Sequence, residues 1–538
     1  MDGLAYDELP NDPEVLKTLL IEHDHTFRQQ LREQRRTLES RHAKALYRLQ
    51  LEIAKLEAER RLDRARRFGA SSEAGDHQYR LFDEAETHAA EALIAEELDA
   101  SDPIEVSAHT KRRPVRKPLP KDLPRVVVNH DLADRQCACG AEMHIIGEKV
   151  SEQLDVIPAQ VYVIEHHRPT YSCSKCDESI VSAPMPPQPI PKSMASPGLL
   201  AHVAIAKYAD GLPLYRQSKQ FERLGIDLPR NTLASHMVKV GALIEPLSKA
   251  LCQHIIGHDI VAMDETPVQV LKEPGKAAQS QSYMWVMRGG PPDKRAILYE
   301  YATTRAQSVP DRLLAGFVGY LQTDGYAGYN AILAADDVTG VGCWAHVRRK
   351  FMDAKKALPT RDQHKGNKVH QALSFIGKLY QLEQSLKDAT VQERQRRRHT
   401  DANEVLDQFK AWLDKQSVPP KTLLGKAINY TLTQWPRLVV YTQDGRLRID
   451  NNLVENAIRP FAIGRKNWLF SDSQAGAKAS ANLYGLIETA KANGLNDYAY
   501  LKHVFAELPR AETEQAVQAL LPWNVDRAAV DAQLIKPS

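Results

Sequence analysis

The sequence predicts a multidomain α+β protein built around an α/β domain. Three observations carry this prediction. Residues 253–358 alternate short apolar, β-prone runs with helical patterns. Residues 13–67 read as one long helix, and proline-rich segments separate this helix from the α/β domain. At 538 residues, with 43% hydrophobic residues, the chain can hold about three to five modules.

The first element is a helix over residues 13–67, which lacks glycine and proline after Pro13. It is rich in Leu, Arg, Glu, Gln and Ala, which favour helices. Four apolar residues follow the alternating spacing of a coiled-coil seam: Leu46, Leu49, Ile53 and Leu56. We therefore expect a coiled coil that joins chains into a homodimer or a higher oligomer. The alternative is a solvated arm that packs on its own chain.

A linker region and a cysteine-containing module follow. Residues 68–124 are proline-rich and basic around KRRPVRKPLPK, which either contacts DNA phosphates or serves as a solubilising tether. In residues 125–182, two close pairs of cysteines suit a structural, tetrahedral Zn²⁺ site: Cys137, Cys139, Cys173 and Cys176. EQLDVI and VYVIEHH are expected to form a hairpin that brings the pairs together. Three histidines are alternative ligands: His144, His166 and His167.

The cysteines and the hydropathy pattern indicate the cellular compartment in which we expect the protein. Paired cysteines in this number suit metal binding in a reducing cytoplasm, and Cys252 and Cys343 are expected to be buried thiols. No apolar run approaches the ~18 residues of a membrane span, and the acidic start MDGLAYDELPND does not resemble a signal peptide. A net charge of +3 does not by itself indicate nucleic-acid binding. We expect no membrane partner and a cytoplasmic, nucleoid-associated protein.

A helical region at residues 193–252 follows a second proline-rich linker. Three helices are expected, and LPRNTLASHMVK is similar to the second half of a helix-turn-helix, with Asn231 or Thr232 capping the helix. Four residues are the expected contacts to a DNA major groove: Arg230, Ser235, His236 and Lys239. The alternative is an ordinary three-helix packing, which gives the same periodicity.

Residues 253–358 form the first part of the α/β domain. Three strands (VAMDETPVQV, SYMWVMRGG and RAILYEYATT) precede a short helix, VPDRLLAGF. A fourth strand, GYLQTD, and a strand–helix unit, VGCWAHVRRKFMDAKKAL, complete this part. This is the ribonuclease H-like order. Asp264 and Asp324 each stand at the end of a β-prone run.

A third acidic residue, Glu455, lies in a helical pattern within residues 441–505, the second part of the same domain. Carboxylates on two strands and one helix suit two Mg²⁺ ions about 3.5–4 Å apart, an arrangement that cleaves phosphodiester bonds. Asp450 is the rival of Glu455 as a metal ligand. Glu265 is expected to point away from Asp264, because neighbouring strand residues alternate between faces.

Residues 359–440 separate the two parts and predict an all-helical insertion with a basic run, QERQRRRH, that covers the site or grips DNA near it. Three residues before Glu455 are expected to cap its helix: Asp450, Asn451 and Asn452. Three basic residues after it are expected to hold DNA phosphates: Arg459, Arg465 and Lys466. Arg459 alternatively orients Glu455 through an ion pair. Residues 506–538 form a C-terminal tail.

These motifs occur together in one known family. MDETP, QTDGYAGYN, GCWAHVRRKF and IDNNLVENAIRPFAIGRKNWLFSDS resemble the transposases of the insertion sequence 66 family of bacterial mobile elements, and the order matches over roughly nine-tenths of the chain. The resemblance implies that Asp264, Asp324 and Glu455 are a catalytic DDE triad using Mg²⁺, with Mn²⁺ able to replace it. It also implies a zinc-finger-like module that helps to hold DNA, and small accessory proteins of the same element as partners.

The predicted function is a DNA transposase that binds the terminal repeats of an element, cleaves DNA and joins the freed 3′-hydroxyl ends to target DNA. His346 follows a strand near the expected site and either assists catalysis, binds a phosphate or packs as a structural histidine. Two other functions stay open: a DNA-binding repressor without catalysis, and a nuclease of the same fold that does not join ends.

Overall fold

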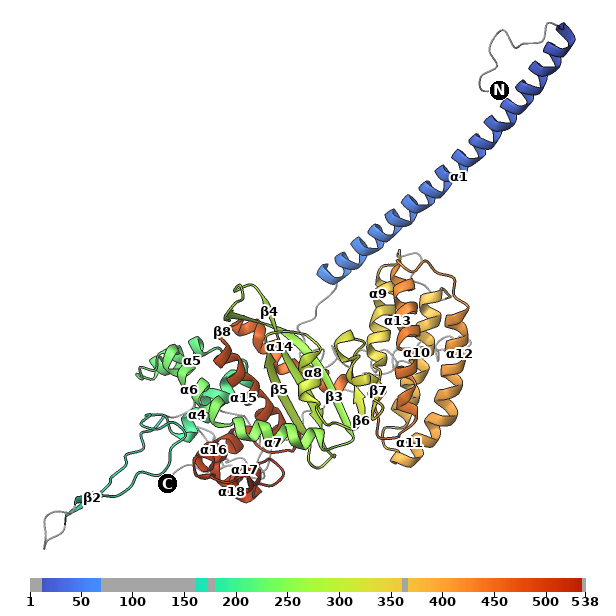
Figure 1. The fold of residues 1–538 in the computed structure, drawn as a ribbon. Helices are drawn as coiled ribbons and strands as arrows, with labels where there is room; N and C mark the ends of the chain where they lie inside the picture. The colour runs from blue at the N-terminus through green and yellow to red at the C-terminus, as the bar shows by residue number, and fades with distance from the viewer. Residues whose placement is uncertain (1–11, 69–160, 173–179, 360–365, 535–538) are drawn as a thin grey trace, which may run out of the picture. The chain divides into compact units, whose positions relative to one another are not determined.

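The computed structural model describes residues 12–68, 161–172, 180–359 and 366–534 (Figure 1). The chain divides into two compact units, one made of residues 98–186 and the other of the residues on either side. Among the described helices, none is long and apolar enough to cross a membrane.

The predicted N-terminal helix is present with nearly the predicted bounds. α1 (Pro13–Phe68) begins after Asp12, whose Oδ1 accepts a hydrogen bond of 3.0 Å from the backbone N–H of Glu14. The predicted seam residues are exposed along this helix: Leu46, Leu49, Ile53 and Leu56. A seam that joins two chains requires exposed apolar side chains at this spacing, so pairing of α1 stays a prediction.

The described residues of the smaller unit include one short hairpin. β1 (Thr170–Ser172) pairs with β2 (Ile180–Ser182) in antiparallel fashion, with Tyr171 opposite Val181. The strand predicted for VYVIEHH is wrong, because residues 161–167 are exposed and pair with no described segment. Other predictions concern residues outside the described part: the basic linker run, EQLDVI, His144, Cys137, Cys139, Cys173 and Cys176.

The helical region contains one helix more than predicted. Its helices are α4 (Pro197–Tyr208), α5 (Leu214–Arg223), α6 (Arg230–Leu243) and α7 (Glu245–Ile256). The predicted third helix is broken at Ile244, because Pro246 opens a new helix there. Asn231 and Thr232 do not cap α6, since the helix begins one residue earlier with Pro229 at its N-cap.

The strands and helices predicted for residues 253–358 are all present. The three antiparallel strands are β3 (Ile260–Lys272), β4 (Gln281–Gly289) and β5 (Ala296–Ala302). After α8 (Ser308–Leu313), two strands extend the sheet in parallel with β3, and a helix follows: β6 (Gly319–Gln322), β7 (Val338–Val341) and α9 (Trp344–Lys356). The sheet is mixed, with strand order β5-β4-β3-β6-β7, and β8 (Ser471–Ser473) also pairs with β3.

Helices from both ends of this unit cover the sheet. α7 and α15 (Gln474–Ala492) pack on β5, and α14 (Asn452–Trp468) packs on β3 and β4. Thr489 of α15 exchanges two hydrogen bonds of 3.0 Å with the backbone of Ile297, which satisfies polar groups of the edge strand. Gly241 of α6 allows α15 to approach closely, because a Cβ there would lie 2.4 Å from the Cβ of Ala479. The remaining helices are α16 (Asp497–Glu507), α17 (Glu514–Ala519) and α18 (Arg527–Asp531).

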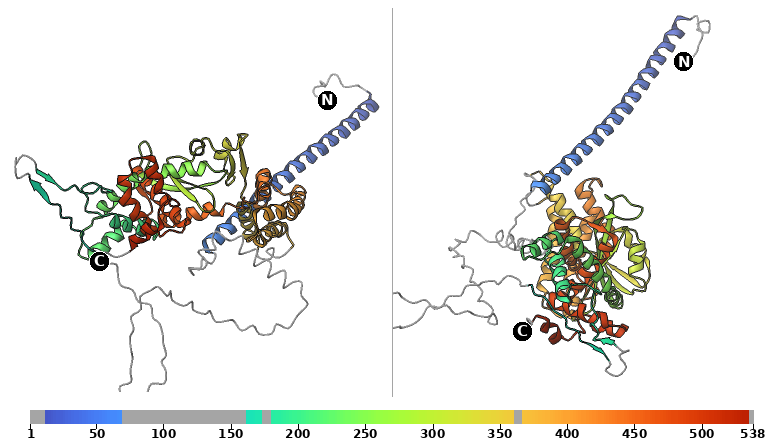
Figure 2. Two further views of the ribbon diagram at one scale, coloured as in Figure 1. Left: turned by 90° about the horizontal axis from the view of Figure 1, so that it is seen from below. Right: turned by 90° about the vertical axis from the view of Figure 1, so that its left-hand side faces the viewer.

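The insertion is all-helical, as predicted, and has a core of its own. Its helices are α10 (Lys368–Ser385), α11 (Val391–Arg397), α12 (Asn403–Asp414) and α13 (Leu423–Leu438). α10 and α13 pack on α9, and α12 packs on α10 and α13 (Figures 1 and 2). Phe409 stacks on Phe375 with centroids 5.1 Å apart, and it also contacts Trp344 and Phe351 of α9. The insertion core therefore includes a helix of the α/β domain.

Candidate active site

Asp264 and Asp324 occupy matching positions on neighbouring parallel strands. The ladder between β3 and β6 ends with Ala262 opposite Gln322, and each aspartate stands two residues further along its chain. The backbone N–H of Tyr326 donates a hydrogen bond of 2.9 Å to Asp324 Oδ1, which orients that carboxylate. The sheet therefore brings the two predicted aspartates to the same end of the ladder.

Burial and neighbouring charges raise the pKa of Asp264 well above its ordinary value. Burial is the largest cause, and the charges of Glu265, Asp324 and Glu455 act in the same direction. A hydrogen bond of 2.8 Å from the backbone N–H of Glu265 offsets only part of this. The helix that carries Glu455 also packs on β3, so the three predicted carboxylates lie in one region of the molecule.

Glu265 has partners of its own. Arg305 Nε donates a hydrogen bond of 2.6 Å to its Oε1, and the Tyr329 hydroxyl donates one of 2.8 Å to its Oε2. The Arg305 guanidinium also lies 3.6 Å from the centre of the Tyr326 ring. Glu265 thus braces the segment that follows β6, and Asp264 is left as the candidate ligand of β3.

Glu455 lies in the first turn of α14 and is 5% exposed. Its Oε2 accepts a hydrogen bond of 3.3 Å from Arg349 of α9. Its Oε1 lies 3.7 Å from Nδ1 of His346 and accepts no hydrogen bond from any described residue. An acidic side chain is favoured at this end of a helix, and the unpartnered oxygen suits a cation.

The residues before Glu455 anchor its helix. Asn451 occupies the N-cap position of α14, and its side chain donates a hydrogen bond of 3.2 Å to the backbone oxygen of Met263 on β3. Asp450 is buried and accepts hydrogen bonds from the Tyr380 hydroxyl (3.0 Å) and from the backbone N–H of Asn452 (3.2 Å). The predicted capping role is thus met by Asp450, whereas the side chain of Asn451 bonds to the strand instead.

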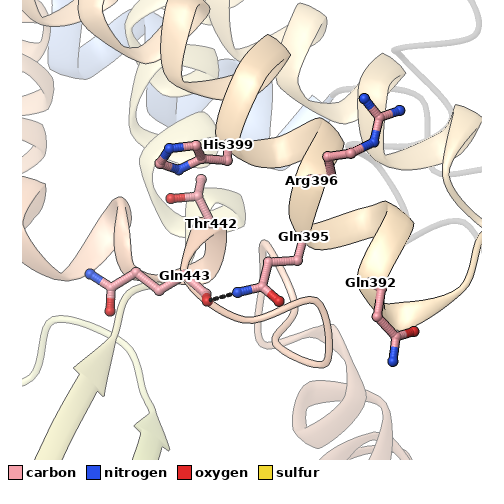
Figure 3. Close-up of a pocket in the computed structure, with 6 residues that line it drawn as sticks. All are labelled: Gln392, Gln395, Arg396, His399, Thr442 and Gln443. Atoms are coloured by element: carbon pink, nitrogen blue, oxygen red, sulfur yellow. Dashed lines mark hydrogen bonds between the residues drawn. The ribbon is translucent and has the colours of Figure 1, made fainter.

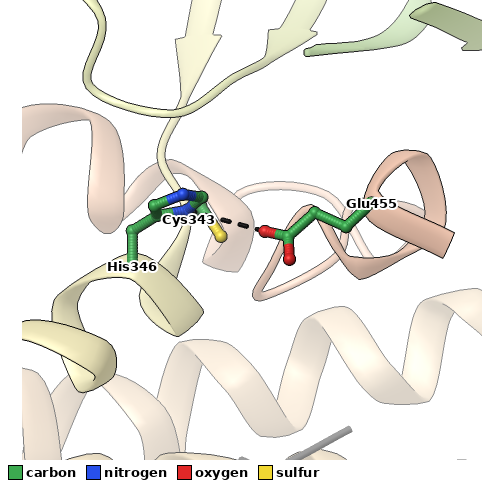
Figure 4. Close-up of side chains that lie close together, drawn as sticks. All are labelled: Cys343, His346 and Glu455. Carbon is green, nitrogen blue, oxygen red and sulfur yellow. Dashed lines mark ion pairs between the residues drawn. The ribbon is translucent and has the colours of Figure 1, made fainter. Parts of the chain in front are cut away.

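Cys343 and His346 adjoin Glu455 (Figure 4). One donor atom from each of the three side chains lies within 4.8 Å of the other two. The Cys343 thiol is buried and accepts a hydrogen bond of 3.2 Å from the backbone N–H of Asn451. Burial lowers the pKa of His346, although the charge of Glu455 opposes that effect. His346 is therefore neutral near pH 7 and can act as a ligand or an acceptor.

The predicted basic residues of α14 differ in their surroundings. Lys466 is exposed. Arg465 donates hydrogen bonds to Thr266 Oγ1 (3.2 Å) and to the backbone oxygen of Pro267, and burial lowers its pKa. Arg459 is half-buried one turn after Glu455. Arg465 therefore ties α14 to β3, and Lys466 offers its charge to solvent.

The predicted DNA contacts on α6 are only partly at the surface. Arg230, Ser235 and Lys239 are exposed, whereas His236 is buried and lies 3.3 Å from the hydroxyl of Ser193. Burial lowers the pKa of His236, which keeps it uncharged. The prediction that His236 contacts DNA is not supported by this position, because its side chain faces the protein interior.

Two arginines of the basic run of the insertion, Arg394 and Arg398, bond to other parts of the protein. Arg398 is 1% exposed, and its Nε and one terminal nitrogen bond to Glu383 at 2.8 and 2.6 Å. Its other terminal nitrogen donates to three backbone oxygens, those of Tyr441, Asp444 and Leu447. Arg394 likewise donates to the backbone oxygen of Gly445, at 3.1 Å. These two arginines hold the segment that leads into α14, so they are not free to grip DNA.

Two cavities open near these elements. One, of about 560 Å³, is lined by Gln392, Gln395, Arg396, His399, Thr442 and Gln443 (Figure 3). Gln395 closes one side of it with a hydrogen bond of 2.7 Å to the backbone oxygen of Gln443. The other, of about 530 Å³, begins at Gly325, directly after Asp324, and extends along α13 to Arg437.

Sequence reasoning missed Arg349 and Tyr380, and it named Asn451 as a capping residue without its bond to Met263. Arg349 stands three residues after His346, and this spacing in a helix predicts that both side chains lie on the same face. Arg349 could therefore have been predicted to lie near the site. The bonds of Asn451 and Tyr380 to distant segments leave no comparable pattern in the sequence.

Comparison with known families decides the identity. The model of the IS66 transposase family matches residues 192–479, more than half of the chain. This chain belongs to the IS66 transposase family. The zinc-finger domain of IS66 transposases matches residues 134–177, which include all four paired cysteines and support a structural Zn²⁺. The C-terminal element of the family matches residues 485–523, and the model described as transposase C of IS166 homeodomain matches residues 55–128.

Three relatives of this IS66 transposase come from Sinorhizobium fredii (strain NBRC 101917 / NGR234) and are named only as uncharacterized proteins. Protein y4jD is 33% identical over 423 residues, which cover 76% of this chain and 81% of y4jD. Protein y4qI is 34% identical and covers 73% of this chain and 74% of y4qI. Protein y4hP is 30% identical over 502 residues, 89% of each chain. The family establishes a transposase role, with DNA as the partner.

Proposed function

We propose that this transposase cleaves and joins DNA at a two-metal site formed by Asp264, Asp324 and Glu455 in a ribonuclease H-like domain. The observation that carries the proposal is the matching position of the two aspartates beyond the parallel ladder of β3 and β6. The strand order β5-β4-β3-β6-β7, with three antiparallel strands followed by two parallel ones, supports the ribonuclease H-like assignment.

The donor set fits divalent cations. Several carboxylates gather where burial already raises the pKa of Asp264, and a cation would relieve their repulsion. Glu455 Oε1 accepts no hydrogen bond from the described residues. Carboxylate oxygens are the ligands that Mg²⁺ prefers, and Mn²⁺ can replace it. Two such ions would activate the attacking oxygen and stabilise the leaving oxygen at the scissile phosphate.

The chain's own residues position the reactants. Asp264 lies on β3 and Asp324 stands two residues after β6. Arg349 of α9 donates a hydrogen bond to Glu455, and His346 lies beside that carboxylate. In the first reaction, water displaces the 3′-oxygen at the element end. In the second, the freed 3′-hydroxyl attacks a target phosphate in line. His346 is an auxiliary residue that contacts either Glu455 or the reacting phosphate.

Other parts of the chain would recognise and pair the element ends. Arg230, Ser235 and Lys239 on α6, in a helix-turn-helix, and Lys466 on α14 are exposed groups for DNA. The four paired cysteines would hold the structural Zn²⁺. The exposed apolar seam of α1 would join two chains, so that cleavage occurs only in a paired complex. Small accessory proteins of the element complete the set of partners.

Comparing the wild type with Asp324→Asn on labelled element-end DNA, Mg²⁺ and a target plasmid tests the proposal. We expect nicked and joined products from the wild type alone, with equal DNA binding by both proteins. Binding without cleavage by either protein, even with the accessory proteins added, would favour a repressor. Cleavage without joined products would favour a nuclease.

A further inference from the structure

The donor atoms beside Glu455 differ in kind from those of the proposed Mg²⁺ site. Cys343 offers a sulfur and His346 a nitrogen, and both lie with a Glu455 oxygen inside a 4.8 Å cluster. Sulfur is a poor ligand for Mg²⁺ but a strong one for Zn²⁺ and Co²⁺. We propose that Cys343, His346 and Glu455 form a second, thiophilic metal site, and that Zn²⁺ bound there inhibits the transposase by withdrawing Glu455 from Mg²⁺.

The geometry requires only a small adjustment. Donors around a tetrahedral Zn²⁺ lie roughly 3.4–3.8 Å apart, given its usual bond lengths. His346 Nδ1 and Glu455 Oε1 already lie 3.7 Å apart, and the cluster spans at most 4.8 Å. A shift of about 1 Å in one side chain would bring all three donor atoms to the distances found around a tetrahedral ion. Three protein ligands leave a fourth position for water.

The unpartnered atoms point to the same occupant. Neither His346 Nδ1 nor Glu455 Oε1 has a hydrogen-bond partner among the described residues, although both atoms are buried. Arg349 takes the other oxygen of Glu455, which leaves Oε1 for a cation. On binding, the Cys343 thiol releases its proton to solvent, and the thiolate and the Glu455 carboxylate together balance the two charges of the ion.

The regulatory part rests on the proposed function, because it requires Glu455 to serve Mg²⁺. Arg349 holds Oε2 of Glu455, so Zn²⁺ and Mg²⁺ would both need the same remaining oxygen, Oε1. Zn²⁺ would therefore compete with catalysis at this position while leaving DNA binding intact.

The site itself is tested without DNA, using the full chain with its zinc-finger module already filled with Zn²⁺. Co²⁺ is titrated, and the thiolate-to-cobalt absorption is followed together with the metal content per chain. We expect thiolate-to-cobalt absorption in the wild type and in Cys252→Ser, which alters a described free cysteine outside the cluster. We expect no such absorption, and one bound Co²⁺ fewer per chain, in Cys343→Ser. Equal absorption and metal content in Cys343→Ser would overturn the site. His346→Ala is the second variant, because its side chain is 20% exposed and its loss is less disruptive to folding.

Inhibition is tested by adding Zn²⁺ to the Mg²⁺-dependent cleavage reaction. Loss of one ligand should raise the inhibitory Zn²⁺ concentration by about tenfold or more in Cys343→Ser, relative to that variant's own activity. An unchanged inhibitory concentration would overturn the regulatory claim. A wild type that binds Co²⁺ but never cleaves DNA would contradict the proposed function while supporting the metal site.

Discussion

The side-chain amide of Asn451 donates a hydrogen bond of 3.2 Å to the backbone oxygen of Met263. Met263 directly precedes Asp264 on β3, and Asn451 stands at the start of the helix that carries Glu455. One buried bond thus joins the two elements that supply candidate ligands from opposite parts of the sequence. It acts together with the bonds of Arg465, which also tie this helix to β3.

Replacing Asn451 with alanine should therefore weaken both folding and catalysis. Leaving the Met263 oxygen without this donor costs about 1–3 kcal/mol in the free energy of unfolding, measured by urea denaturation. Cleavage should fall about tenfold or more, because small displacements of a catalytic group are costly. Asn467→Ala is the matched control, since Asn467 is exposed near the end of the same helix and bonds to Gly211. Equal cleavage by both variants would refute the positioning role.

Tyr380 links the insertion to the same helix start through its hydrogen bond to Asp450. Burial and the charge of Asp450 raise the pKa of Tyr380 well above its ordinary value, so the hydroxyl stays a donor at neutral pH. Tyr380→Phe removes that donor and should lower the free energy of unfolding by about 1.5–3 kcal/mol. Tyr215→Phe, at an exposed position, should change it by less than about 0.5 kcal/mol. Thermal and urea unfolding of the two variants would reveal the difference.

Asp264 should destabilise the metal-free protein. Because the pKa of Asp264 is raised in the folded protein, its carboxyl group keeps a proton that the unfolded chain has already released. The free energy of unfolding therefore falls as the pH rises from the pKa in the unfolded chain to the higher pKa in the folded protein. At a pH above both pKa values, Asp264 is charged in the folded protein, and the full free-energy cost of burying this charge is present. Asp264→Asn should consequently raise the metal-free unfolding free energy at pH 7 by about 1–2 kcal/mol while abolishing cleavage.

The control for this effect is Asp336→Asn, which alters an exposed aspartate on a nearby loop. It should leave both stability and cleavage nearly unchanged. A less stable Asp264→Asn protein at pH 7 would contradict the claim that the Asp264 carboxylate is held at a cost.

Arg398 is a structural cation. Replacing it with alanine leaves half-buried Glu383 and three backbone oxygens without their partner, which should cost about 3–5 kcal/mol. Arg396 lies two residues earlier in the same basic run, exposed and paired with Glu393. Arg396→Ala should cost less than about 1 kcal/mol. Similar unfolding curves for the two variants would show that Arg398 does not hold the insertion together.

The strands could be predicted from the sequence, whereas the different surroundings of Arg396 and Arg398 could not. Short apolar, β-prone runs such as VAMDETPVQV and SYMWVMRGG predict strands; in the second, four consecutive residues are buried, as in a strand covered on both faces. Asp324 stands two residues beyond β6, as expected, whereas Asp264 lies inside β3, which continues to Lys272. The run QERQRRRH carries no comparable signal: Arg396 and Arg398 look alike in sequence, yet one is exposed and the other is buried.

The remaining errors have physical causes of the same type. His236 lies on a helix whose periodicity fits several packings, and only the contact with Ser193 shows which face is inward. Pro246 begins a second helix, because proline is tolerated in a first turn. The bond from Asn451 to Met263 depends on how distant segments pack, which local propensity does not record.

The central claim is that Asp264, Asp324 and Glu455 jointly bind divalent metal. Electron paramagnetic resonance of Mn²⁺ measures it most directly, by counting bound ions on the zinc-loaded chain with element-end DNA. The account predicts two bound Mn²⁺ ions in the wild type and in Asp336→Asn. It predicts fewer ions, or much weaker binding, in Asp264→Asn, Asp324→Asn and Glu455→Gln. Undiminished Mn²⁺ binding by these three variants would contradict it.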